Sequence, residues 1–292
     1  MRALRFLPPI LRYAALALGA VAMIAPFLDM FLGALRTPAE RLANPPPYWP
    51  ADPQWGNFLR AFQDLPMASW LANSVIVTSS ITLLQLATSA MAGYALAKFR
   101  FVGSGLLLRG VLGAQMFPFF LLIIPIFFML RFVPLVGGND LFGAGGSGLL
   151  GSYAALILPF AVTWYGVFLM RQFFMNVPDE IIDAARIDGA GEVRIFLTIV
   201  LPLVRPGLVT LGIFVFIYHW NEVIWTMTVT RSAPALQTMP VGIYLLRGAF
   251  ADQSSESLQR AAICVSVLPV MLVFLSLQRF YIRGLTAGSV KG

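Results

Sequence analysis

The sequence has few of the residues from which soluble enzymes and secreted scaffolds are built. Of its 292 residues, 11% are charged, one is a histidine and one is a cysteine, whereas soluble domains carry roughly 25% charged residues. Because Cys264 has no partner in the chain, a disulfide framework is excluded. Only Lys98 and Lys291 are lysines and neither follows a glycine. A phosphate-binding loop ending in Gly-Lys is therefore absent, and we expect no ATP to bind here in that way.

Catalytic and metal-binding groups are equally scarce. A zinc site needs three or four protein ligands, which a chain with one histidine and one cysteine does not readily supply. No serine, histidine and acid are spaced as a catalytic set, and the net charge of +7 is spread without a dense basic cluster. We therefore expect no catalytic residue, no metal site and no nucleic-acid partner. These absences also disfavour a membrane enzyme or assembly factor.

What the sequence does have is hydrophobicity. Hydrophobic residues make up 59% of the chain and the mean hydropathy is +0.80, whereas soluble domains contain about 45–50% apolar residues. A transmembrane helix needs about 20 mostly apolar residues. The stretches that satisfy this length are about 11–35, 70–97, 104–131, 149–174, 206–228 and 259–282. The sequence predicts an all-α polytopic membrane protein, with 1–292 as a single transmembrane domain of six helices in contact with membrane lipids.

The basic residues predict the orientation of these spans. One side of the membrane would hold both termini and the loop at about 175–205, and it carries 13 basic and 5 acidic residues. The other side carries 7 basic and 8 acidic residues. Cytoplasmic loops carry the excess of lysine and arginine, so both termini and this loop are predicted to be cytoplasmic. The first stretch is too long for a signal-peptide core and is expected to remain as an uncleaved helix.

Three outer loops follow from this orientation. The loop at 36–69 is rich in proline and is predicted to be a stiff, extended strap. The glycine-rich loop at 132–148 is expected to be a flexible connector, since Asn139 and Asp140 offer too few oxygens for a calcium site. The loop at 229–258 mixes proline, charged and apolar residues.

The spans contain few ionisable residues. His219 and Glu222 lie three positions apart in the fifth span and are predicted to share a helix face. A proton relay, a metal site and a buried polar pair facing a pathway or partner helix are the alternatives, of which the polar pair is favoured. Ion-coupled carriers and pumps use mid-membrane ionisable residues, so their scarcity disfavours a secondary carrier that works alone.

The segment from Asn176 to Pro206 is the most informative part of the chain. Pro178 is expected to start a helix whose first turn is acidic, which suits the positive end of the helix dipole. Gly189 follows where a sharp turn is needed, and a second helix is predicted from Ala190 or Gly191, capped by Asp188. One face of the first helix is predicted to hold Ile181, Ala184, Ala185 and Asp188.

The charge of this first helix indicates what it contacts. Amphipathic helices in cytoplasmic loops often lie on lipid headgroups and are then rich in lysine and arginine. This helix instead carries Asp179, Glu180, Asp183 and Asp188. An acidic surface suits a soluble protein partner better than an anionic membrane.

The run Asp183-Ala184-Ala185-x-x-Asp188-Gly189-Ala190, followed by Leu201-Pro202-Leu203, resembles the EAA loop of permease subunits of binding-protein-dependent ABC importers. One departure is that Asp183 stands where the family usually has glutamate. The resemblance covers essentially the whole chain. Within the family, the chain most resembles the carbohydrate-uptake branch, and in that branch the smaller permease of the maltose-type or glycerol-phosphate-type systems. The other matching segments are Asn73-Ser74, Tyr94–Lys98, Trp220-Asn221-Glu222 and Gly284–Gly292.

The resemblance implies a non-catalytic subunit of an ATP-driven sugar importer in the bacterial inner membrane. Its implied partners are a second permease in a heterodimer, two cytoplasmic ATPases that hold ATP and Mg, and an external sugar-binding protein or lipoprotein. No cofactor is expected in this chain. The implied ATPase-coupling residues are Glu180, Asp183, Ala184, Ala185, Arg186, Asp188, Gly189 and Ala190. His219, Trp220, Asn221 and Glu222 are candidates to line or gate the pathway, with a purely architectural role as the alternative.

Overall fold

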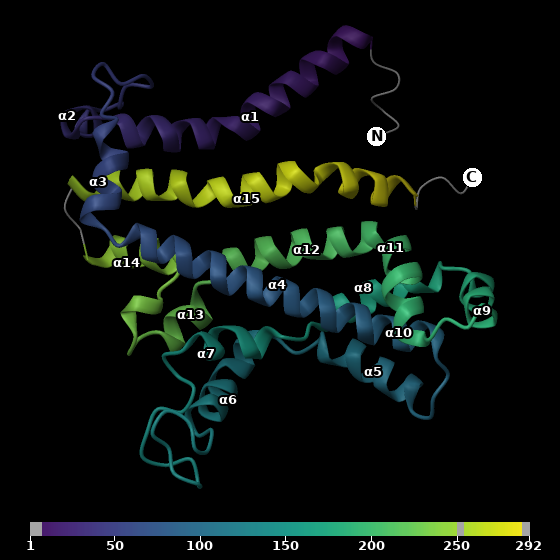
Figure 1. The fold of residues 1–292 in the computed structure, drawn as a ribbon. Coiled ribbons are helices and arrows are strands. Elements are labelled where there is room, and N and C mark those ends of the chain that lie inside the picture. Colours follow the sequence, from purple (N-terminus) through teal and green to yellow (C-terminus); the bar gives the residue numbers. More distant parts are fainter. Residues whose placement is uncertain (1–7, 250–253, 288–292) are drawn as a thin grey trace. The chain divides into compact units, whose positions relative to one another are not determined.

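In the computed structural model, the chain is built from helices (Figure 1). The structure describes residues 8–249 and 254–287, with side chains over 8–246 and 256–278. Within these residues every regular element is helical, which confirms the all-α class. The backbone divides into two compact units: residues 1–68 with 242–268, and residues 69–241 with 269–292. A single transmembrane domain stays a prediction.

Three helices are long and apolar enough to cross a membrane by themselves. They are α1 (Pro9–Leu35), α4 (Met67–Lys98) and α15 (Ser254–Ala287). These helices coincide with the first, second and sixth predicted stretches. Residues 1–7 and 288–292, which include both predicted cytoplasmic termini and the end of the Gly284–Gly292 match, lie outside the described residues.

The other predicted stretches are not single straight helices. Helices α5 (Ser104–Ala114) and α6 (Phe119–Arg131) meet at 105°, and α7 (Tyr153–Ile157) with η2 (Leu158–Phe160) meets α8 (Trp164–Met175) at 45°. The break before α6 contains Pro118, and the residue before a proline disfavours helical backbone. The chain has up to six candidate spans if each bent pair crosses the membrane once, counted over the described residues.

The fifth stretch also differs from its prediction. Helices α10 (Glu192–Arg194), η3 (Ile195–Val200) and α11 (Leu201–Leu203) form one helical segment, which meets α12 (Arg205–Trp220) at 77°. The predicted span at 206–228 is therefore interrupted, because α12 ends at Trp220 and α13 (Ile224–Val229) follows after a turn.

The loop at 36–69 is not the uninterrupted extended strap that was predicted. It contains α2 (Pro38–Leu42) and α3 (Gly56–Asp64). A capping box starts α2, because the Thr37 hydroxyl accepts from the Glu40 backbone N–H while the Glu40 carboxylate accepts from that of Thr37. Asn57 anchors α3 by donating a 2.8 Å hydrogen bond to the Ala34 carbonyl.

The glycine-rich loop after α6 is held by hydrogen bonds that Asn139 and Asp140 make within it. Asn139 Nδ2 donates to the backbone carbonyls of Arg131 and Val133 at 2.8 and 2.9 Å. Asp140 Oδ1 accepts from the backbone N–H groups of Phe142 and Ala144, both at 2.8 Å. These bonds give the loop a defined local backbone, and its role as a flexible connector stays a prediction.

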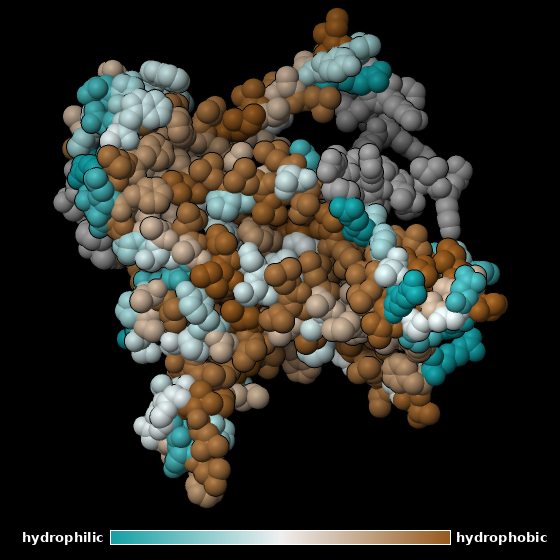
Figure 2. Space-filling view, in the orientation of Figure 1, coloured by the Kyte–Doolittle hydropathy of each residue, from teal (hydrophilic) through white to brown (hydrophobic). Residues whose placement is uncertain are grey.

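The hydrophobic core of the larger unit lies between α4, α8 and the segment that follows α8. Tyr94 contacts Phe174 and Phe196, with ring centroids 5.4 and 5.1 Å apart. Ile182 and Ile195 are 2% and 0% exposed in the same cluster. In Figure 2 hydrophobic residues cover most of the visible helical surface, and hydrophilic residues gather around α9 (Asp179–Ile187). The core therefore includes part of the predicted coupling loop.

Candidate functional site

The predicted coupling helix is α9. Pro178 occupies its N-cap position rather than its first turn, and the helix ends at Ile187. Gly189 follows with φ of +80°, as the predicted sharp turn requires. The second helix has Gly191 at its N-cap position, and no side chain caps it. Capping by Asp188 was therefore wrong: Asp188 ends α9, and its backbone N–H bonds to the carbonyls of Ala184 and Arg186.

The predicted face of α9 is divided between the core and the surface. Ile182 and Ala185 are buried at 2% and 7% exposure. Ala184 and Asp188 are exposed together with Glu180, and Ala190 is half-buried against the core. Ile181 and Ile187 are 39% and 87% exposed. Helix α9 thus presents an exposed outer face that is apolar, small-chained and acidic.

Lys98, the last residue of α4, connects that helix to the start of α9. Its ammonium group lies 2.6 Å from Asp179 Oδ1 and also donates to the Val177 carbonyl at 2.5 Å. The hydrogen bond and charge of Lys98 lower the pKa of the Asp179 carboxyl. The lysine side chain is only 6% exposed. Sequence reasoning missed this contact, although Lys98 is one of two lysines in the chain.

Arg186 connects α9 to the next helix. Its guanidinium lies 2.7 Å from Glu192 and 2.9 Å from Asp183. Hydrogen bonds to Glu192 first and Asp183 second raise the pKa of Arg186 above its already high value. The Asp183 carboxylate of the EAA-like motif is therefore engaged inside the chain. Together Lys98 and Arg186 attach α9 at both ends.

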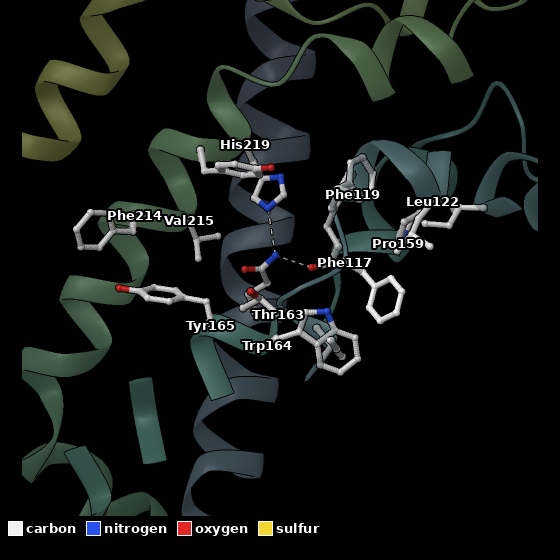
Figure 3. Close-up of a pocket in the computed structure, with 16 residues that line it drawn as sticks. Phe117, Phe119, Leu122, Pro159, Thr163, Trp164, Tyr165, Phe214, Val215 and His219 are labelled. Atoms are coloured by element: carbon white, nitrogen blue, oxygen red, sulfur yellow. Dashed lines mark hydrogen bonds between the residues drawn. The ribbon is translucent and has the colours of Figure 1, made fainter. Parts of the chain in front are cut away.

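A second candidate site is a cavity of about 560 Å³ in the larger unit (Figure 3). Helix α4 contributes Gln85, and α12 contributes Phe214 and His219. The two breaks, between α5 and α6 and between η2 and α8, also line it. Their aromatic residues in the cavity wall include Phe117, Phe119, Trp164 and Tyr165.

Hydrogen bonds at the polar end of this cavity determine which nitrogen of His219 carries a hydrogen. Gln85 Nε2 lies 2.7 Å from the Phe160 carbonyl and 3.1 Å from His219 Nε2. Because a carbonyl only accepts, the Gln85 atom beside it must be the amide NH₂, and His219 Nε2 must accept its other proton. A neutral His219 therefore carries its hydrogen on Nδ1. That nitrogen is buried and has no hydrogen-bond partner in the described part of the chain.

The structure separates the four predicted gate residues. Only His219 lines the cavity. Trp220 is 2% exposed and stacks on Phe216 at 5.6 Å, whereas the Asn221 amide donates to the Ile217 carbonyl at 2.7 Å. Because α12 ends at Trp220, His219 and Glu222 do not share a helix face, contrary to the prediction.

Glu222 caps the following helix, α13. Its carboxylate accepts from the Trp225 backbone N–H at 2.6 Å, and from the Thr226 N–H and hydroxyl at 2.9 and 2.8 Å. A carboxylate in the predicted membrane region thus accepts hydrogen bonds from local donors. The pathway role of the tetrad stays a prediction. No group of three metal-ligating side chains occurs among the described residues.

Comparison with known proteins identifies the class as transport permeases of bacterial inner membranes. Residues 86–286 match the family described as binding-protein-dependent transport system inner membrane components. The chain belongs to this family. It is a permease subunit of an ABC importer that works with a binding protein, rather than a carrier that works alone.

Relatives of similar length support this assignment. A sulfoquinovosyl glycerol transport system permease of Agrobacterium fabrum is 32% identical, over 97% of this chain and 94% of the relative. An arabinooligosaccharides transport system permease of Halalkalibacterium halodurans is 33% identical, over 93% of each chain. An sn-glycerol-3-phosphate transport system permease of Pectobacterium atrosepticum is 30% identical, over 94% of this chain and 95% of the relative.

A solved structure supports the fold. A chain from the crystal structure of a bacterial ABC transporter that imports the acidic polysaccharide alginate matches with a TM-score of 0.77 and 22% identity. The match covers 93% of this chain and 95% of the other. The fold is therefore that of an ABC importer permease, as the sequence predicted.

Proposed function

We propose that this chain is the non-catalytic permease subunit of an ATP-driven saccharide importer. It pairs with a second permease, docks one of two cytoplasmic ATPases that bind ATP and Mg, and receives substrate from an external binding protein or lipoprotein. Both termini and α9 lie on the cytoplasmic side. The saccharide class is supported by the relatives, which include permeases for arabinooligosaccharides and sulfoquinovosyl glycerol.

The observation that carries the proposal is the outer face of α9. Ile187 and Ile181 are exposed on a short helix that is attached to the rest of the unit by Lys98 and Arg186. An exposed apolar face on an attached helix indicates a protein contact surface. Displacement of α9 by an ATPase would pass to α4 through Lys98 and to α10 through Arg186.

Cross-linking tests this docking surface. In the assembled complex with Cys264→Ser, a benzophenone attached at Ala184→Cys on α9 is expected to cross-link to an ATPase subunit. Tyr13→Cys is the control, because Tyr13 is 73% exposed near the start of α1 on the predicted cytoplasmic side. Equal cross-linking from both positions, or none from Ala184→Cys, would remove the docking role.

Uptake tests the transport function itself. Proteoliposomes that contain the complex and its binding protein should accumulate saccharide only when ATP is supplied on the ATPase side. Arabinotriose, diacetylchitobiose and sulfoquinovosyl glycerol are suitable substrates, since permeases for each class of compound are among the relatives. Uptake without ATP would contradict the proposal.

A further inference from the structure

The cavity lies beside the middle of the long helix α4. Gln85 is near the centre of α4, and His219, the second-last residue of α12, lies 3.1 Å from the Gln85 amide. The break between α5 and α6 lies midway along 104–131, and the break around Thr163 lies midway along 149–174. The cavity is therefore expected near the middle of the bilayer, where a translocation pathway would have to pass.

The break between η2 and α8 leaves backbone carbonyls without helical partners at this depth. Gln85 donates to the Phe160 carbonyl, and the Thr88 hydroxyl donates to the Ala161 carbonyl at 2.9 Å. Irregular backbone at membrane depth is tolerated only where it is buried in protein or lines a watery cavity. Side chains of α4 satisfy these carbonyls, and Phe160 itself lines the cavity.

The lining combines aromatic rings with uncharged polar groups. Trp164, Tyr165 and Phe214 are 46%, 45% and 45% exposed, so their rings are accessible at the cavity wall. Gln85 and Thr163 add an amide and a hydroxyl. Among the residues whose side chains the structure describes, no aspartate, glutamate, lysine or arginine lines the cavity. The volume of about 560 Å³ lies within the roughly 300–1,000 Å³ of small-molecule sites.

This lining matches the chemistry of an uncharged sugar. The C–H faces of a pyranose or furanose ring pack on aromatic rings, and its hydroxyls need neutral donors and acceptors. The unpartnered Nδ1–H of His219 is a buried donor, which is costly unless a water or a ligand oxygen satisfies it. A phosphate, sulfonate or uronate would instead require a basic partner, which this lining lacks.

We propose that this cavity is a transit site for neutral saccharides within this subunit. The inference rests on the proposed import function and narrows its substrate class to uncharged mono- and oligosaccharides. Aromatic residues of α8 and α12 hold the sugar ring, and the polar end at Gln85 and His219 bonds its hydroxyls. The second permease completes the enclosure.

The test measures how many saccharide molecules are imported per ATP hydrolysed. The full complex with its binding protein is reconstituted in proteoliposomes, with arabinotriose, diacetylchitobiose and sn-glycerol 3-phosphate as substrates. Trp164→Ala should lower the import of the neutral saccharide about five- to tenfold, because one ring contact is lost. Trp164→Tyr should restore import, because it returns an aromatic ring to this position.

Two further variants keep the test decisive. Phe128→Ala on α6 is the matched control, because Phe128 is 50% exposed but lies outside the cavity; it should import normally. Phe214→Leu removes a second cavity ring at similar volume and provides the measurement if Trp164→Ala fails to assemble.

Three outcomes have distinct meanings. Equal import per ATP in Trp164→Ala, Phe214→Leu and Phe128→Ala would overturn the proposal that the cavity is a transit site. Lipid or the partner permease would then occupy the cavity. Import of sn-glycerol 3-phosphate alone would overturn the neutral substrate class. Failure of the wild-type complex to import any of the three in an ATP-dependent way would instead contradict the proposed function from which the inference starts.

Discussion

Gly189→Val in the turn after α9 tests whether this helix couples the permease to its ATPase. Gly189 has φ of +80°, a region that β-branched residues rarely adopt. A Cβ at this position meets no atom within 4 Å, so the penalty is backbone strain rather than collision. Such strain costs on the order of 1–3 kcal/mol, which would lower the population of the native turn by about five- to 150-fold if the turn were free to change.

Gly191 supplies the matched control, two residues away. Its φ of −69° and ψ of 154° are extended backbone that valine adopts readily, and a Cβ there also meets no atom within 4 Å. Gly191→Val should therefore retain coupling. Gly189→Asn should be intermediate, because asparagine tolerates the left-handed region better than valine does.

The assay is ATP hydrolysis stimulated by the binding protein, together with ATP-driven uptake, in proteoliposomes containing the assembled complex. Gly189→Val is expected to lose most of both activities while the permease still inserts and pairs. If Gly189→Val and Gly191→Val behaved alike, the left-handed turn would not be required for coupling. If Gly189→Val abolished membrane insertion, its effect would lie in folding rather than in transmission.

The remaining predictions concern three other contacts. Lys98→Met should uncouple ATP hydrolysis from uptake several-fold, measured as saccharide imported per ATP, whereas Arg109→Met on exposed α5 should not. The pKa of Asp179 is lowered in the folded chain. The ion pair between Lys98 and Asp179 is therefore expected to be constant from pH 5 to 8, and to be lost only as the pH falls below the usual aspartate pKa of about 3.9. The yield of cross-linking from α9 to the ATPase, measured against pH, should follow this trend. Glu222→Gln should weaken the α13 cap by about 1 kcal/mol and lower the thermal stability of the complex; loss of uptake at unchanged stability would favour a gate. The predicted outer loop at 229–258 contains a helix, α14 (Met239–Ala249), and we expect this segment to contact the binding protein. Tyr244 is 53% exposed on α14, so Tyr244→Asp should reduce stimulation by the binding protein, and full stimulation would move docking to the segment at 36–69.

The sequence by itself determined the class of this protein and most of its organisation. Long apolar stretches with few charges require a lipid environment, because they exceed what one globular core could bury. The spacing from Asp183 to Ala190 predicted a short helix, a glycine turn and a second helix, since these depend on local backbone preferences. The sharp turn at Gly189 was predicted from a glycine directly after the first helix, and its φ of +80° agrees with that prediction.

Only the tertiary structure decided which residues meet. Lys98 and Asp179 are 81 positions apart, and Gln85 and His219 are 134 apart, so no local pattern relates them. The helix breaks that form the cavity also escaped prediction, because a run of apolar residues has the same composition whether its helix is straight or bent. The assignment of Glu222 to a cap depended on where α12 ends, which is set by packing and turn geometry rather than by the spacing of His219 and Glu222.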